Sequence, residues 1–148
     1  MKVVEGYTLG QLLGHGAFAK VRLATRNGEK VAMKVASKSF LRKMKENYRD
    51  EQGVLRQRSA LQKAYVEIDV LAKASHPRIP KLYDVFEDDF DDKIYLVLQL
   101  AEKNALVDWS DEDQSFHITR QGLTELSEAR ISSIASQCLE ALEYRTQP

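Results

Sequence analysis

The stretch that decides the fold is "KVRLATRNGEKVAMKV", residues 20–35. Two runs of alternating apolar and polar residues flank Asn27 and Gly28. This dipeptide is typical of the type I′ turn, because both central residues of that turn need positive φ. The sequence therefore predicts a β-hairpin in which Arg26 pairs with Glu29.

The same register continues along both strands and places Leu23 opposite Ala32 and Val21 opposite Lys34. Directly opposed residues share one face of a sheet. One face of the predicted hairpin therefore carries three apolar side chains and a single ammonium group. Such a surface suits an apolar base, with phosphates beside the lysine.

A glycine-containing loop, "LLGHGAFAKV", residues 12–21, precedes the hairpin. A dinucleotide-binding fingerprint needs a helix directly after its glycines, and here a strand follows. A Walker A loop needs Gly-Lys-Ser/Thr, which this loop lacks. Two interpretations remain: a loop that cradles phosphates, or a flexible turn without a ligand.

Loop and strand together resemble the protein kinase family. "LGHGAFAKV" is similar to the G-x-G-x-x-G-x-V loop, with Ala19 at the third glycine position, and "VAMK" is similar to the V-A-I-K strand. The resemblance implies an α+β small lobe, a five-stranded antiparallel sheet with one regulatory helix, that binds ATP. It implies that Lys34 holds the phosphates.

A helix is predicted from "SALQKAYVEIDVLAKASHP", residues 59–77. Ser59-x-x-Gln62 is a capping-box pattern, and Pro77 disfavours helix at the residue before it. The helix has one apolar stripe, formed by Leu61, Ala64, Tyr65, Ile68, Leu71 and Ala72. "VEIDVLAKASHPRI" resembles the family's regulatory helix, which implies that Glu67, at the edge of the stripe, pairs with Lys34 as the second catalytic residue.

Two more strands are predicted at "KLYDVFED" and "KIYLVLQL", joined by the acidic "DDFDD", which we interpret as a solvated loop. The resemblance makes the end of the second strand the hinge to a larger lobe. It implies a gatekeeper at 98 and adenine contacts through the backbone at 99 and 101. The nucleotide site it implies comprises Leu13, Gly14, His15, Gly16, Ala17, Phe18, Ala19, Val21, Ala32, Lys34, Leu98, Gln99 and Ala101.

Composition limits the other possibilities. With 148 residues, 43% of them hydrophobic, we expect one domain or part of one. Twenty-two basic residues balance 22 acidic ones, so we expect neither nucleic acid nor a membrane as partner. A single cysteine and the lack of a signal-peptide pattern favour a cytoplasmic location, with a nuclear one also possible. Three scattered histidines predict no metal cluster.

Residues 37–58 form a basic insert between the lysine strand and the helix. This insert and the hinge "LVLQLAEKNALVDW" most resemble the upstream serine/threonine kinases related to calcium/calmodulin-dependent kinase kinase. The resemblance implies protein substrates that are themselves kinases. It divides the chain into a small lobe, 1–98, and a hinge with an incomplete helical larger lobe, 99–148.

The last segment, "LSEARISSIASQCLEALEYRTQP", predicts a helix whose apolar stripe a larger lobe would cover. The sequence contains no H-R-D, D-F-G or A-P-E motif, so the family's Mg²⁺ ligands are absent from this chain. We therefore expect a chain that binds ATP but is inactive alone, and self-association through the helix at 127–145. Two alternatives stay open: a non-catalytic binding module or decoy, and an unrelated nucleotide-binding or structural domain.

Overall fold

The computed structural model describes residues 2–102, 105–119 and 125–146. The chain divides into two compact units. The first comprises residues 1–75 and 80–100, and the second comprises residues 76–79 and 101–148. The first unit contains the main sheet and the helices that pack on it.

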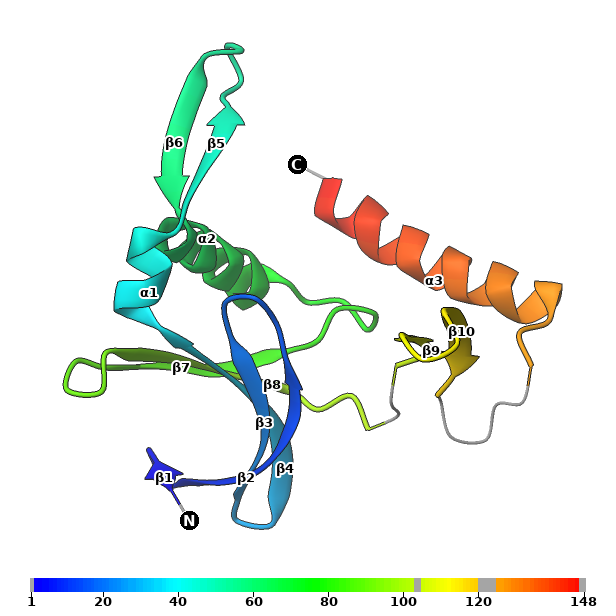
Figure 1. Ribbon diagram of the computed structural model, residues 1–148, viewed down its shortest axis with the longest axis horizontal. Coiled ribbons are helices and arrows are strands. Elements are labelled where there is room, and N and C mark those ends of the chain that lie inside the picture. The colour runs from blue at the N-terminus through cyan, green and yellow to red at the C-terminus, as the bar shows by residue number, and fades with distance from the viewer. Residues whose placement is uncertain (1, 103–104, 120–124, 147–148) are drawn as a thin grey trace. The chain divides into compact units, whose positions relative to one another are not determined.

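The main sheet of the first unit has six antiparallel strands in the order β1-β2-β3-β4-β8-β7 (Figure 1). Its α+β architecture is the one predicted, but the predicted count of five strands is wrong by one. The added strand, β1, has two residues, which is too short to show any periodicity in the sequence. The six strands are β1 (Val3–Val4), β2 (Tyr7–His15), β3 (Lys20–Arg26), β4 (Glu29–Ser37), β7 (Leu82–Asp88) and β8 (Lys93–Gln99).

The hairpin β3–β4 has the predicted register. Asn27 and Gly28 form its turn with φ of 52° and 84°, as a type I′ turn requires. The three predicted pairs are Arg26 with Glu29, Leu23 with Ala32, and Val21 with Lys34, and all are present. The prediction from residues 20–35 is confirmed.

The two faces of the sheet carry separate apolar clusters. One face is filled by Tyr7, Leu9, Ala24, Val31, Met33, Tyr95 and Val97. On the other face Ile94 and Leu96 of β8 contact the helices α1 (Lys38–Lys43) and α2 (Ala60–Lys73) through Leu41 and Leu61. The helices therefore cover the face that also carries Lys34.

Helix α2 begins at the predicted capping box. The Ser59 hydroxyl accepts a hydrogen bond from the Gln62 backbone N–H at 3.2 Å, and the Gln62 side-chain oxygen accepts one from the Ser59 N–H at 2.8 Å. The helix ends at Lys73, before Pro77, as predicted. Leu61 is its one buried residue, while Ala64 and Ile68 are half-buried against the sheet.

The basic insert is structured. It forms α1 and then the hairpin β5 (Lys45–Arg49) and β6 (Leu55–Ser59), which extends away from the main sheet (Figure 1). Both strands are almost wholly polar, so the sequence shows no alternation that predicts them. The turn does carry a signal, since Asp50 accepts two backbone N–H bonds and Gly53 has a φ of 76°.

The second unit contains the hairpin β9 (Val107–Ser110) and β10 (Ser115–Ile118) and the helix α3 (Glu128–Thr146). Trp109 and Phe116 face each other across the hairpin, with ring centroids 5.0 Å apart. The sequence analysis predicted α3 but not this hairpin. Within the described ranges, no helix combines the length and apolar character needed to cross a membrane.

Candidate functional site

The site is centred on an ion pair between β4 and α2. The Lys34 ammonium donates a hydrogen bond to a carboxylate oxygen of Glu67 at 2.8 Å. The two side chains are 32% and 44% exposed, so the pair is accessible to solvent. The structure thus brings together the two residues that the resemblance assigned to each other.

The local sequence explains why these groups meet. Alternation along β4 places Lys34 on the same face as Ala32, and the register places Leu96 of β8 beside it. On α2, Leu61, Ala64 and Ile68 direct one stripe onto this face. Glu67 lies at the edge of the stripe and reaches the ammonium from there.

The glycine loop closes over this face of the sheet. It joins β2 to β3, and the Gly16 backbone N–H donates to the Ala19 carbonyl at 2.8 Å. Neither Gly14 nor Gly16 has a positive φ. Beyond the adjacent residues, a Cβ at Gly14 would meet no atom within 4 Å, and one at Gly16 would first meet the Ala19 oxygen at 3.9 Å. The fold itself therefore does not require glycine at these two positions.

A cavity of about 400 Å³ lies between the glycine loop, the sheet and α2. This volume is within the range of small-molecule sites, about 300–1,000 Å³. Its lining includes most of the residues from Gly16 to Val21, together with Lys34 and Glu67. Apolar side chains of α1 and β8, among them Leu41 and Leu96, form its inner wall. The Lys34–Glu67 ion pair therefore lies beside a mostly apolar wall.

Several predicted site residues do not line this cavity. Ala32 and Leu98 are a direct pair in the β4–β8 ladder, two residues along from the Lys34–Leu96 pair and on the same face of the sheet. They continue the face beyond the cavity, toward the end of β8. The other predicted residues outside the lining are Leu13, Gly14, His15, Gln99 and Ala101.

Two of those residues have contacts of a different kind. His15 lines a second cavity, which it shares with the loop residues 16–19 and with Lys20 and Arg22. Gln99 exchanges hydrogen bonds with Lys81, donating from its backbone N–H at 2.8 Å and accepting at its side-chain oxygen at 3.3 Å. Ala101 is exposed and belongs to the second unit.

The sequence analysis missed part of the lining of the first cavity. They come from the basic insert and the start of α2, and include Met44, Lys45, Glu46 and Lys63. The Glu46 carboxylate accepts bonds from Arg58 at 2.7 Å and from Lys63 at 3.1 Å, and these bonds lower its pKa. No local pattern could have placed them here, because the hairpin β5–β6 brings them back to α2.

No metal centre is formed by the described ranges: they contain no group of three or more histidine, cysteine, aspartate or glutamate residues arranged to hold an ion. The cations that line the first cavity are Lys34, Lys45 and Lys63.

Comparison with known proteins decides the family. The profile of the protein kinase domain matches residues 7–146. The chain belongs to the protein kinase family. The kinase match includes the glycine loop, Lys34 and Glu67, so the geometry described above is that of the small lobe of a kinase.

Individual relatives are serine/threonine kinases. The chain is 30% identical over 146 residues to CBL-interacting serine/threonine-protein kinase 8 of Arabidopsis thaliana, covering 97% of this chain and 27% of the relative. It is 29% identical over 146 residues to the SNF1-related protein kinase catalytic subunit alpha KIN12 of the same plant, covering 97% and 24%. It is 32% identical over 143 residues to the carbon catabolite-derepressing protein kinase of Saccharomyces cerevisiae, covering 95% and 18%. The chain spans about a quarter or less of the length of these relatives.

Proposed function

We propose that the chain binds ATP beneath the glycine loop, as the nucleotide-binding part of a serine/threonine protein kinase domain. The observation that carries the proposal is the cavity of about 400 Å³ that Gly16 lines together with the Lys34–Glu67 ion pair. Glycine is favoured where a ligand approaches the backbone closely, and the fold provides no other reason for it here. ATP fits both features, with phosphates under the loop and an apolar base on the face beyond.

In this proposal Lys34 holds phosphate oxygens, and Glu67 holds Lys34. The paired carboxylate fixes the ammonium at one point of the face, so little freedom is lost when phosphate binds. The base is received by the apolar residues that share this face of the sheet, Val21, Ala32 and Leu98. The residues from Gly16 to Ala19 exclude water from the phosphates.

Phosphoryl transfer in the family breaks the bond between the γ-phosphorus and its bridging oxygen while the substrate hydroxyl oxygen bonds to that phosphorus. Mg²⁺, when bound in a complete domain, neutralises the developing charge. The base that orients the hydroxyl belongs to H-R-D, which this sequence does not contain. We therefore propose that this chain binds the nucleotide without transferring phosphate by itself. That the substrates are other kinases stays a prediction of the resemblance to upstream kinases.

Calorimetric titration with ATP, ADP and adenosine tests the proposal. Affinity should increase with the number of phosphates, because the charged contacts of the site are made to phosphate. Equal affinity for adenosine and ATP, or no binding of any of the three, would overturn it. A parallel incubation with γ-labelled ATP and a serine-containing peptide should leave the peptide unlabelled.

A further inference from the structure

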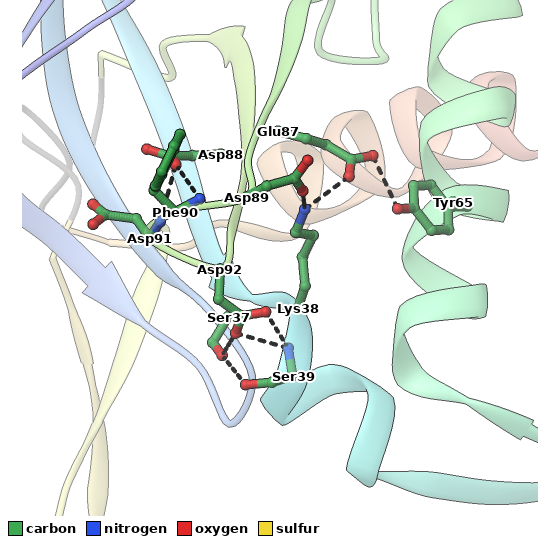
Figure 2. Close-up of polar contacts among 10 residues, drawn as sticks. All are labelled: Ser37, Lys38, Ser39, Tyr65, Glu87, Asp88, Asp89, Phe90, Asp91 and Asp92. Atoms are coloured by element: carbon green, nitrogen blue, oxygen red, sulfur yellow. Dashed lines mark hydrogen bonds and ion pairs between the residues drawn. The ribbon is translucent and has the colours of Figure 1, made fainter.

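We propose that Tyr65 and Glu87 are positioning residues that hold Glu67 against Lys34 from the opposite edge of α2. This inference deepens the proposed function and rests on it. It starts from a polar cluster at the β7–β8 turn in which the groups donate to and accept from one another (Figure 2).

Glu87 is the centre of the cluster. One of its carboxylate oxygens accepts from the Tyr65 hydroxyl at 2.9 Å, and the other accepts from the Lys38 ammonium at 3.2 Å. Lys38 also pairs with Asp89, and its side chain is only 8% exposed. One carboxylate therefore joins α2 to the residue that directly follows β4 (Figure 2).

These contacts form a closed ring with the candidate site. Along β4 the chain leads from Lys34 to Lys38, and along α2 it leads from Tyr65 to Glu67. The Lys34–Glu67 pair joins β4 to α2 at one side of the ring. At the other side Glu87 joins Lys38 to Tyr65. A displacement of α2 that breaks the Tyr65–Glu87 bond therefore also strains the Lys34–Glu67 pair.

Helix geometry shows what the ring controls. Successive residues are about 100° apart around an α-helix, so Tyr65 and Glu67 are about 200° apart. The stripe that contacts the sheet, formed by Leu61, Ala64 and Ile68, lies between them. Apolar contacts are non-directional and allow a helix to roll, whereas hydrogen bonds are directional. Because Tyr65 contacts Glu87 at one edge of the stripe and Glu67 contacts Lys34 at the other, a roll of α2 in either direction strains one of these contacts.

The protonation states suit this role. Burial, and then the bond to Glu87, raise the pKa of Tyr65, so the phenol remains a donor at neutral pH. The bonds to Asp89 and Glu87 outweigh burial and raise the pKa of Lys38, so it remains a cation. Tyr65 and Lys38 are therefore both donors to Glu87 at neutral pH.

The reactivity of Lys34 toward an acylating reagent tests the inference without nucleotide. An ammonium held by a carboxylate is acylated slowly by an N-hydroxysuccinimide ester, and mass spectrometry measures the rate residue by residue. Loss of the hydrogen bond between Tyr65 and Glu87 should increase the fraction of Lys34 that is not paired with Glu67 by about three- to tenfold. Tyr65→Phe should increase its acylation by that factor, while Tyr83→Phe, at an exposed tyrosine of β7, should leave it unchanged.

The same substitution made in a Glu67→Gln variant separates positioning of Glu67 from a general loss of rigidity of the fold. In a Glu67→Gln variant the ion pair is already weakened, so adding Tyr65→Phe should change the Lys34 rate no further. An equal increase in both backgrounds, or no increase in either, would overturn the inference. If Tyr65→Phe does not fold, Glu87→Gln, which removes the charge facing Lys38, replaces it in the same comparison.

Nucleotide affinity is the second readout. Tyr65→Phe should weaken ATP binding in proportion to the loss of the paired fraction of Lys34, while Tyr83→Phe should leave the affinity unchanged. If the wild-type chain binds no nucleotide, the proposed function fails, but the acylation experiment still decides whether Tyr65 positions the ion pair.

Discussion

Lys34→Met separates a functional lysine from a structural one. The substitution keeps an unbranched, apolar side chain on β4 and removes the ammonium group. In the structure that group has one carboxylate partner, Glu67, at 2.8 Å, and the two side chains are 32% and 44% exposed. The consequences for folding and for ligand binding are therefore expected to differ in size.

The effect on folding should be small. Ion pairs that solvent reaches contribute about 0–1 kcal/mol to stability, because water and salt screen them. The effect on ATP binding should be larger. A hydrogen bond to a charged group is worth about 1.5–3 kcal/mol, which corresponds to an affinity about 10- to 150-fold weaker. The quantity to measure is the ratio of the loss in ATP-binding free energy to the loss in the free energy of unfolding.

Urea unfolding gives the first loss, and calorimetric titration with ATP gives the second. Lys30→Met is the matched control, because Lys30 is an exposed lysine of the same strand. The control should change neither quantity appreciably. A Lys34→Met chain that binds ATP as tightly as the wild type, or one that loses several kcal/mol of stability, would refute the reasoning.

Three further outcomes follow from the described contacts. Ser59→Ala removes the N-cap of α2 and should lower the free energy of unfolding by about 1 kcal/mol, measured by urea titration; no change would mean that the capping box contributes nothing. The hydroxyl and backbone N–H of Ser39 lower the pKa of Asp92 to about 2 from its ordinary 3.8, so the stability it contributes is present above about pH 4 and is lost as the pH falls toward 2. Asp92→Asn should reduce the acid sensitivity of the melting temperature over that interval, and identical acid profiles would contradict this. Leu139 of α3 is 64% exposed, so sedimentation should show self-association of the wild type that Leu139→Glu reduces; a monomeric wild type would exclude it.

Local signals predicted the parts of the fold that local chemistry determines. Asn27 and Gly28 set the turn, and alternation then set the register that places Lys34 opposite Val21. Ser59 set the start of α2 in the same way, and the resemblance supplied the partner Glu67. In each case the determining residues lie within a few positions of one another.

Contacts between distant segments were not predictable in this way. Glu87 was assigned to a strand beside a solvated acidic loop, yet it binds Tyr65 and Lys38, which are 22 and 49 positions away. The Asp92 side chain accepts the Ser39 backbone N–H at the start of α1, another long-range contact. Charge counts show that this segment is acidic, but only the packing of α1 and α2 on the sheet determines which cations and hydroxyls it meets.

The same reasoning applies to the cavity. The sequence predicted the loop and Lys34, but not that Lys45 and Glu46 of β5 would also line the cavity. Polar strands carry no alternation, so their position depends on the turn at Gly53 and on α1 before them. The predicted residues at the end of β8, Leu98 and Gln99, pair with Ala32 and Val31 and lie outside the cavity.

Labelling with an ATP-derived acyl phosphate tests the central claim most directly. Such a reagent binds as ATP does and transfers its acyl group to an amine beside the phosphates, so the labelled residue identifies the phosphate site. We predict that mass spectrometry finds the acyl group on Lys34, that excess ATP prevents the labelling, and that Lys30 stays unlabelled. Labelling spread over exposed lysines and unaffected by ATP would contradict the account.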